Sequence, residues 1–250
     1  MPTFIYKPKG KAAEYGDYAL NIYMSCTHKC FYCYCPSVLR KDKDDFYANP
    51  IPREGIVEGV KNQLKSNGMK NKTIHLCFIG DPYPNGADTS VTREIIKVIK
   101  DSGNHVQILT KNGLDAIRDF DLLDENDWFG ISYAGYPFNS YNDDVVPDTE
   151  PGAGSPYWRI KALKMAHNLG IKTWVSCEPV VDDIDVISFI RRTNFVNLWK
   201  VGKLNYHPSD IDWHAFGHEV ERLLKTKCKH HNCEYYIKES LRKEMNKDAN

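Results

Sequence analysis

Residues 25–36 read Ser25-Cys-Thr-His-Lys-Cys-Phe-Tyr-Cys-Tyr-Cys-Pro36 and contain half of the cysteines in the chain. Three of them, Cys26, Cys30 and Cys33, are spaced Cys-x3-Cys-x2-Cys, and Cys35 follows two residues later. The stretch comes directly after the apolar segment 18–24, which is typical of a strand that runs into a loop. Thiolates gathered on one tight loop indicate an iron–sulfur cluster or zinc, because both prefer soft sulfur ligands.

The spacing favours a cluster over zinc. Three thiolates can hold three irons of a [4Fe–4S] cluster and leave the fourth iron open to another ligand. Structural zinc usually takes its ligands from two separated pairs, and no second pair lies nearby in the sequence. A compact zinc site completed by Cys35 or His28 remains the alternative at this point.

Outward from this loop, short apolar runs alternate with helical patterns. The predicted strands cover 18–24, 73–79, 105–110, 128–133, 171–177 and 195–201, and the predicted helices cover 53–66, 89–102, 113–124, 155–168 and 183–192. Such alternation predicts βαβ units and a parallel sheet. The chain is short for a closed eight-unit barrel with so many loops. We therefore expect an α/β fold, a partial (β/α)6 TIM-like barrel.

The barrel is expected to occupy residues 1–201. Residues 202–250 are expected to form a C-terminal helix–strand–helix extension that packs on the barrel within the same domain. In such folds ligands bind at the carboxyl ends of the strands. The segment 134–154, rich in Gly, Pro, Asp and Asn, follows the fourth strand and is a candidate lid.

Composition narrows the class of protein. The 250 residues are 42% hydrophobic and carry 33 basic and 33 acidic side chains, as in an ordinary globular protein. The sequence shows neither a long apolar run nor a signal peptide, so we expect a cytoplasmic protein without a membrane partner. Balanced charge does not imply a broad grip on nucleic acid. A local patch could still come from Lys200, Lys203, Tyr206, His207, Lys238, Arg242 and Lys243.

The cysteine spacing after the first strand, with Tyr32 directly before the third cysteine, resembles the radical SAM superfamily. Later motifs resemble its spore photoproduct lyase-related branch, often labelled DNA repair photolyases, over about residues 20–182. These motifs are Gly80-Asp-Pro-Tyr-Pro84, Leu109-Thr-Lys-Asn112, Arg118-Asp119, Ile131-Ser132, Glu150-Pro151 and Ser155-Pro156 with Arg159.

The resemblance implies a set of cofactor contacts. Cys26, Cys30 and Cys33 would bind the [4Fe–4S] cluster, whose open iron would be chelated by S-adenosyl-L-methionine. Tyr32 would lie near the adenine. The remaining contacts would come from the ends of later strands: Gly80 and Asp81 at the methionine amino group, and Lys111 and Ser132 at the carboxylate and ribose. Apart from the resemblance, Glu178 ends the fifth predicted strand, where such folds place active residues; it could bind the ribose or substrate, or form a salt bridge at the rim.

The implied reaction is reductive cleavage of S-adenosyl-L-methionine to a 5′-deoxyadenosyl radical, which abstracts hydrogen from a substrate. The electron would come from an external donor of the flavodoxin or ferredoxin type. By the same likeness the substrate would be a nucleic acid or nucleotide base. Two alternatives stay open: a radical SAM enzyme acting on a peptide, tRNA or small molecule, and a non-enzymatic zinc or iron–sulfur module.

Three cysteine positions, Cys35, Cys77 and Cys177, depart from the lyase pattern. The lyase uses a strand-end cysteine as hydrogen-atom donor, but that position holds Phe78 here and the thiol, Cys77, comes one residue earlier. Cys77 is the candidate catalytic residue, although an offset of one residue turns a strand side chain to the opposite face. Cys228-Lys-His-His-Asn-Cys233 could be a second metal site or a polar turn after a helix.

Overall fold

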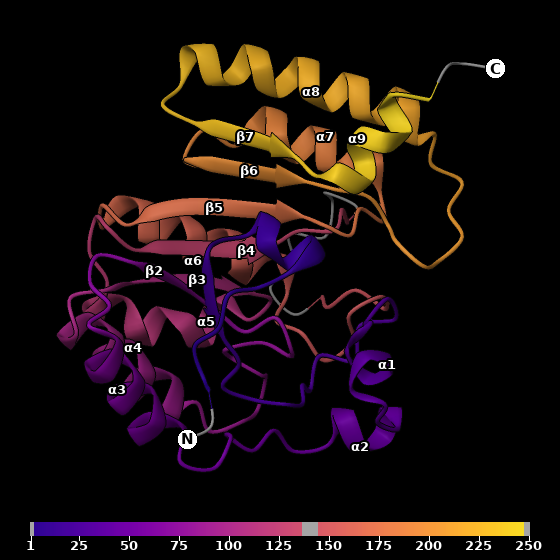
Figure 1. The fold of residues 1–250 in the computed structure, drawn as a ribbon. Coiled ribbons are helices and arrows are strands. Elements are labelled where there is room, and N and C mark those ends of the chain that lie inside the picture. The colour runs from indigo at the N-terminus through magenta and orange to yellow at the C-terminus, as the bar shows by residue number, and fades with distance from the viewer. Residues whose placement is uncertain (1–2, 137–144, 248–250) are drawn as a thin grey trace.

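The computed structural model describes residues 3–136 and 145–247, and its strands form one open parallel sheet (Figure 1). The strands follow chain order: β1 (Tyr18–Leu20), β2 (Thr73–Leu76), β3 (His105–Thr110), β4 (Trp128–Ser132), β5 (Lys172–Cys177), β6 (Leu198–Val201) and β7 (Glu234–Ile237). The predicted α/β fold is confirmed. The C-terminal extension does not only pack on the sheet, because its strand β7 pairs in parallel with β6 and becomes part of the sheet.

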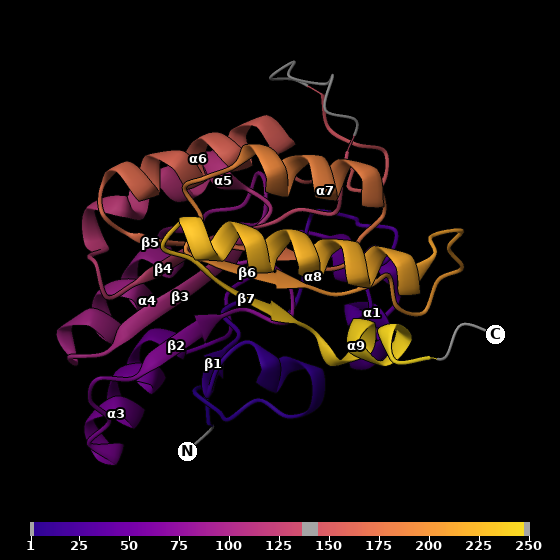
Figure 2. The same ribbon diagram turned by 90° about the horizontal axis from the view of Figure 1, so that it is seen from above.

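Helices cover the outer side of the curved sheet (Figure 2). They are α3 (Ile56–Asn67), α4 (Ser90–Asp101), α5 (Gly113–Ala116) with the 3-10 turn η2 (Ile117–Leu122), α6 (Pro156–Asn168), α7 (Asp183–Arg192) and α8 (Trp213–His230). Four short elements lie elsewhere: η1 (Gly10–Glu14), α1 (Cys35–Leu39), α2 (Lys43–Tyr47) and α9 (Glu239–Met245).

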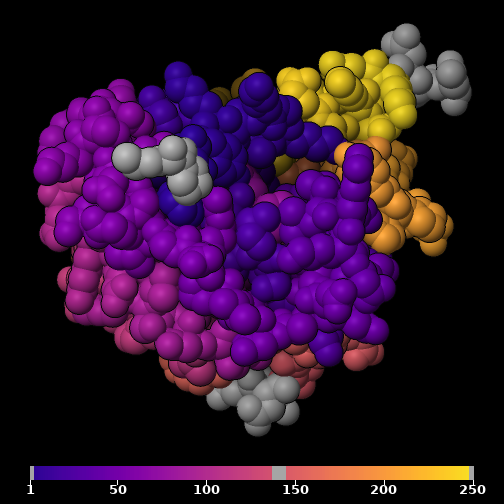
Figure 3. Space-filling model, turned by 60° about the horizontal axis from the view of Figure 1, so that its bottom comes forward, coloured from indigo at the N-terminus to yellow at the C-terminus, as the bar shows by residue number. Residues whose placement is uncertain are grey.

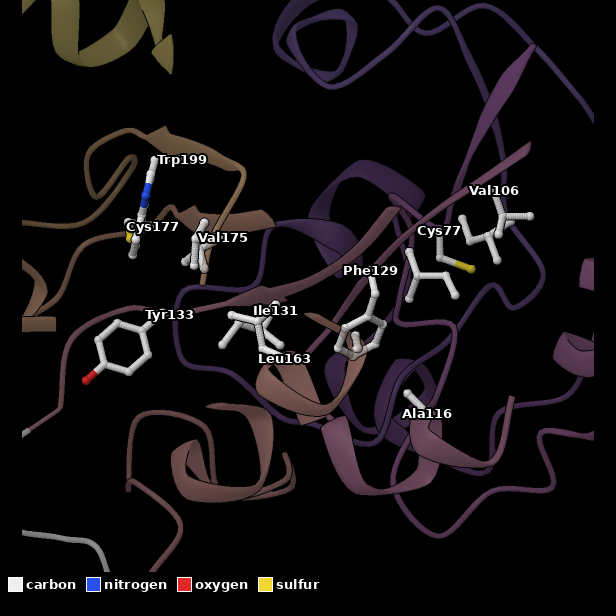
Figure 4. Close-up of a cluster of buried hydrophobic side chains, with 14 of the residues drawn as sticks. Cys77, Val106, Ala116, Phe129, Ile131, Tyr133, Leu163, Val175, Cys177 and Trp199 are labelled. Atoms are coloured by element: carbon white, nitrogen blue, oxygen red, sulfur yellow. The ribbon is translucent and has the colours of Figure 1, made fainter. Parts of the chain in front are cut away.

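Strand side chains alternate between the two faces of the sheet. Those facing the helices, such as Ile74, Ile108, Phe129 and Val175, are fully buried in one apolar core (Figure 4). Burial of each such side chain stabilises the fold by about 1.5–3 kcal/mol. The strand pattern therefore fixes the register and brings all the carboxyl strand ends to one edge.

The inner face of the sheet is filled rather than hollow. Trp174 of β5 lies across the sheet, and its Nε1 donates to the Ile108 carbonyl at 2.8 Å. This crossing requires Gly130 on β4, because a Cβ there would lie 2.3 Å from Trp174 Nε1. His75 and Lys200 also lie on this face, so the amino-terminal half of the barrel is a packed core of aromatic and polar groups.

The N-terminal segment closes the side of the sheet left open between β1 and β7 (Figure 2). Tyr6 exchanges two backbone hydrogen bonds of 2.9 Å with Ala19 of β1. On the other side, Lys200 of β6 donates to the carbonyls of Glu14 at 2.6 Å and Tyr15 at 3.2 Å. Residues 6–15 thus tie the first strand to the last ones.

Candidate active site

The cysteine loop lies directly after β1, at the carboxyl edge of the sheet. Cys26 and Cys30 are buried and Cys33 is half-buried. The loop is turned by a hydrogen bond of 3.0 Å from the Cys33 amide to the Cys30 carbonyl. A hydrogen bond with Cys35 is the main cause that lowers the pKa of the Cys33 thiol to about 6, so this sulfur is a thiolate at neutral pH.

The segment after β2 supports the cysteine loop through close backbone contact. Gly80 adopts a φ of +80°, and a Cβ at this position would lie 2.5 Å from the Ser25 carbonyl oxygen. Only glycine satisfies both constraints. Asn21 holds the same segment from the end of β1, because its Oδ1 accepts from the amides of Phe78 at 2.8 Å and Ile79 at 2.9 Å.

Asp81 is a structural centre of the site. Its carboxylate accepts from the Tyr83 amide at 2.8 Å, the Thr110 hydroxyl at 2.6 Å and the Lys111 amide at 2.9 Å. His28 Nδ1 of the cysteine loop lies 3.6 Å from the same carboxylate. The side chain of Asp81 therefore joins three loops, and a contact of this residue with a ligand is left to its backbone.

His28 is held in the same way. Its Nε2 accepts from the Asn85 amide at 3.3 Å, and burial lowers its pKa to about 4, so the ring is neutral at pH 7. One ring nitrogen is thus engaged with backbone and the other faces Asp81. This arrangement speaks against His28 as the fourth ligand of a zinc site.

The segment before α6 packs on the far side of the cysteine loop. The Phe31 amide donates to the Thr149 carbonyl at 3.1 Å, and the Gly152 amide donates to the His28 carbonyl at 3.0 Å. A Cβ on Gly152 would lie 2.0 Å from the Thr27 carbonyl oxygen, so the two backbones touch. Residues 145–154 belong to the candidate lid, whose part 137–144 lies outside the described residues.

A buried ion pair anchors that segment to the sheet. Arg159 Nη2 lies 2.6 Å from Glu150 Oε2, and both side chains are 0% exposed. Arg159 also donates to the carbonyls of Gly154 at 2.8 Å and of Ser132, the last residue of β4, at 3.2 Å. Glu150 and Arg159 thus hold the segment that contacts the cysteine loop in a fixed position relative to the end of β4.

Tyr32 and Lys111 lie together beside the cysteines. Lys111 Nζ, just beyond β3, is 5.5 Å from the centre of the Tyr32 ring. Burial, the largest single influence, lowers the pKa of Lys111, but Cys30, Asp81 and Tyr136 together raise it by more, so the net shift is upward and the ammonium stays charged. The Tyr32 hydroxyl is buried without a hydrogen-bond partner among the described residues. This pair offers a cation and an aromatic face to a ligand.

Glu178 belongs to a second network across the mouth. It forms an ion pair with Lys238 and accepts from the Tyr15 hydroxyl at 3.1 Å and Asn205 Nδ2 at 3.3 Å. The backbone of Gly202 gives it room, because a Cβ there would lie 2.7 Å from Glu178 Oε1. The hydrogen bonds and ion pair of Glu178 thus join it to the N-terminal and C-terminal segments. Sequence reasoning missed Tyr15 entirely, since no motif surrounds it.

Cys77 points into the core beneath the sheet, among Val106 and other apolar side chains (Figure 4). Its sulfur accepts from the Ile22 amide at 3.4 Å. Cys177 lies on the same core side of the sheet. We do not carry Cys77 into the proposed chemistry, because its thiol faces away from the mouth.

The structure does not support two other predictions, the second metal site at Cys228 and Cys233 and the C-terminal basic patch. Cys228, in the last turn of α8, and Cys233 are bonded to each other as a disulfide, so neither is a free metal ligand. Most of the suggested basic patch is neutralised or buried. Lys203 pairs with Glu244, Arg242 with Glu221 and Lys238 with Glu178, while Lys200 binds the N-terminal backbone.

Comparison with known proteins places the chain in a family. A model described as the radical SAM superfamily matches residues 20–186. The chain belongs to the radical SAM superfamily. It is accordingly an enzyme of the radical SAM class, a family that implies S-adenosyl-L-methionine and an iron–sulfur cluster. The non-enzymatic alternative is thereby set aside.

Two relatives by sequence extend the match. An uncharacterized protein of Methanocaldococcus jannaschii is 30% identical over 208 residues, which is 82% of this chain and 75% of the relative. An uncharacterized protein of Mycobacterium tuberculosis is 23% identical over 172 residues, 67% of this chain and 50% of the relative. The chain thus spans half the length of the mycobacterial relative.

Solved radical SAM structures share the fold. Spore photoproduct lyase complexed with dinucleoside spore photoproduct superposes with a TM-score of 0.64 and 13% identity, over 93% of this chain and 79% of that one. Native anSMEcpe with bound AdoMet and Cp18Cys peptide gives a TM-score of 0.59 and 14% identity, over 88% of this chain and 62% of that one.

None of the helices in the described part of the chain is both long and apolar enough to cross a membrane.

Proposed function

We propose that this radical SAM enzyme binds a [4Fe–4S] cluster through Cys26, Cys30 and Cys33 and reductively cleaves S-adenosyl-L-methionine to start hydrogen abstraction from a substrate. The observation that carries the proposal is the gathering of these three thiols on one backbone-braced loop at the carboxyl edge of the sheet. That edge is where ligands bind in parallel α/β folds.

The donor set fits a cluster with one open iron. The hydrogen bond from Cys35 lowers the pKa of the Cys33 thiol, as suits a metal ligand, whereas burial raises the pKa values of Cys26 and Cys30, whose protons metal binding would release. Cys35 is not counted as a fourth ligand, because its hydrogen bond to Cys33, together with burial, raises the pKa of its thiol and keeps it protonated. His28 is likewise engaged. A three-thiolate site therefore accounts for the residues present.

The chain's own residues would bind and orient S-adenosyl-L-methionine. The Lys111 ammonium suits the methionine carboxylate, and the adjacent Tyr32 ring suits the adenine. The backbone of Gly80, which touches the cysteine loop, would offer a polar group to the methionine amino group, and Ser132 offers a hydroxyl to the ribose or carboxylate. When bound, the cluster supplies the electron that breaks the carbon–sulfur bond of this cosubstrate, and the protein's role is to orient it and exclude water.

The substrate would enter at the hollow between the N-terminal segment, the C-terminal segment and the cysteine-loop region (Figure 3). We propose that it contains a nucleobase, supported by the likeness in fold to spore photoproduct lyase, whose complex holds a dinucleoside. The electron would come from an external flavodoxin- or ferredoxin-type donor in the cytoplasm. The family's need for an electron donor supports this part.

The proposal is tested by electron paramagnetic resonance on anaerobically reconstituted, dithionite-reduced protein, with and without S-adenosyl-L-methionine. We expect a reduced [4Fe–4S] signal that shifts on adding the cosubstrate, followed by release of 5′-deoxyadenosine. Cys30→Ser should lose the signal, whereas Cys35→Ser, the matched control on the same loop, should keep it. A protein that takes up zinc, or a signal indifferent to the cosubstrate, would overturn the proposal.

A further inference from the structure

Exposed aromatic rings gather on the rim of the mouth above the Glu178 network. Tyr206, in the loop after β6, is 83% exposed, and Phe31 of the cysteine loop is 43% exposed. His207 joins the two loops, because its ring lies 5.2 Å from that of Phe31 at an angle of 69°. Single exposed rings are ordinary on a protein surface, but adjoining ones beside the mouth of a site mark a candidate contact surface.

Tyr206 is held outward against its own backbone preference. Its φ is +67°, in the left-handed region that favours glycine, and a bulky residue there is strained. The ring is solvent-exposed, so packing within the chain does not repay this strain. Strain of this kind at an exposed aromatic residue points to a contact with something outside the chain.

A cation accompanies the rings. Lys11, in η1, places its Nζ 4.8 Å from the centre of the Tyr206 ring and donates to Asn205 Oδ1 at 2.9 Å. Asn205 in turn donates to Glu178, which links the rim to the buried network below. Lys11 has no carboxylate partner among the described residues, unlike Lys203 and Arg242 nearby. Its charge is therefore available to an anion.

We infer that this rim, made of Phe31, Tyr206, His207 and Lys11, binds a nucleobase by stacking and its attached phosphate by charge. Aromatic faces stack on any base, and a neighbouring ammonium matches the phosphate. A single local cation also agrees with the chain's balanced charge, since a nucleotide needs no broad basic surface. The inference rests on the proposed function and assigns its substrate-binding surface.

Two sources share this chemistry, a free nucleotide and an unpaired base in a strand, so both are used as probes. Binding of a fluorescent single-stranded decanucleotide and of nucleoside monophosphates is measured anaerobically with the reconstituted protein at low salt. Tyr206→Ala should weaken binding of the responding probe about 5- to 150-fold, the range for losing one stacked base, and Lys11→Ala should make it less sensitive to salt.

Matched variants separate recognition from folding. Tyr206→Phe should bind normally, because it keeps the ring and the same strained backbone. Lys172→Ala removes a lysine that lies 5.6 Å from the Trp128 ring at the amino ends of β4 and β5, so it should leave binding unchanged. Equal binding by the parent protein and Tyr206→Ala, or no binding of either probe by the parent, would overturn the inference.

Formation of 5′-deoxyadenosine, measured in the same preparations, distinguishes failure of the rim inference from failure of the proposed function. If the parent protein cleaves S-adenosyl-L-methionine but binds neither probe, the rim inference alone fails. If no cleavage and no cluster signal are found, the proposed function fails first. Capture of a peptide in place of both nucleotide probes, undiminished in Tyr206→Ala, would also refute the rim inference.

Discussion

Replacement of Arg159 by methionine should be among the most damaging single changes outside the cysteine loop. Arg159 and Glu150 are both 0% exposed, so Arg159→Met leaves a buried carboxylate without its counter-charge. The change also removes the donors to the carbonyls of Ser132 and Gly154. Breaking one side of a buried ion pair typically costs about 3–5 kcal/mol, and the backbone acceptors left without donors add to that cost.

The measurement is urea unfolding of the reduced, metal-free protein, with the free energy of unfolding taken from the transition. Arg191→Met is the matched control, because its pair with Glu219 is of similar length, at 2.7 Å, but has side chains 54% and 41% exposed. An exposed pair contributes about 0–1 kcal/mol, so the two arginine variants should differ by at least about 2 kcal/mol.

The pair should also show strong coupling. The double variant Glu150→Met with Arg159→Met leaves no unpaired buried charge, so it should cost less than the sum of the two single changes. Because residues 149–152 brace the cysteine loop, Arg159→Met should lower iron uptake as well. An Arg159→Met variant that loses less than about 1 kcal/mol and shows no coupling to Glu150 would refute this reasoning.

The remaining predictions address the site and its surroundings. Gly80→Ala should reduce the iron bound per chain after reconstitution, because its Cβ would lie 2.5 Å from the Ser25 carbonyl oxygen. The control Gly68→Ala has φ +58° and open space around it, so it should keep full iron and lose only about 1 kcal/mol of unfolding free energy. A normal iron content in Gly80→Ala would contradict the packing argument. Lys111→Met should weaken binding of S-adenosyl-L-methionine at least tenfold in anaerobic dialysis, with iron content unchanged; unaltered affinity removes Lys111 from the site. Burial lowers the pKa of Lys200 from 10.5 to about 8. Between these pH values the unfolded chain holds a proton that the folded chain lacks, so the free energy of unfolding should rise with pH across this window. Unfolding curves of Lys200→Met should lack that rise.

Short apolar runs that alternate with helical patterns predicted most of the scaffold. Each of the six predicted strands appears, because an apolar run buried in a parallel sheet has a strong signature. The segment 113–124 is a single helical turn followed by a 3-10 turn instead of one helix. The elements α1, α2 and η1, which are only five residues each, were not predicted, since so short a helix shows no periodicity.

Some residues of the candidate site could be predicted from the sequence and others could not. Gly80 and Lys111 follow strands and lie within recognisable motifs, so their place near the cysteine loop was predictable. Glu178 also ends a strand, but its partners Tyr15 and Lys238 lie 163 and 60 residues away in the sequence. Such pairings arise from closure of the sheet by the N-terminal segment, which has no local pattern. Sequence periodicity constrains neighbours on one element and not contacts of this range.

The mouth therefore has two halves with different origins. The half proposed to bind the cofactor comes from β1 to β4, and the family model, which matches residues 20–186, covers all of these strands except the first two residues of β1. The opposite half combines the end of β5 with β6, β7 and the N-terminal segment, most of which lie outside that match. Resemblance to the family thus informs how the cosubstrate would be bound but carries little information on what the enzyme acts upon. Substrate choice has to be argued from the residues of the second half, where Tyr15, Glu178 and Lys238 fill the interior and the exposed ring of Tyr206 stands above them.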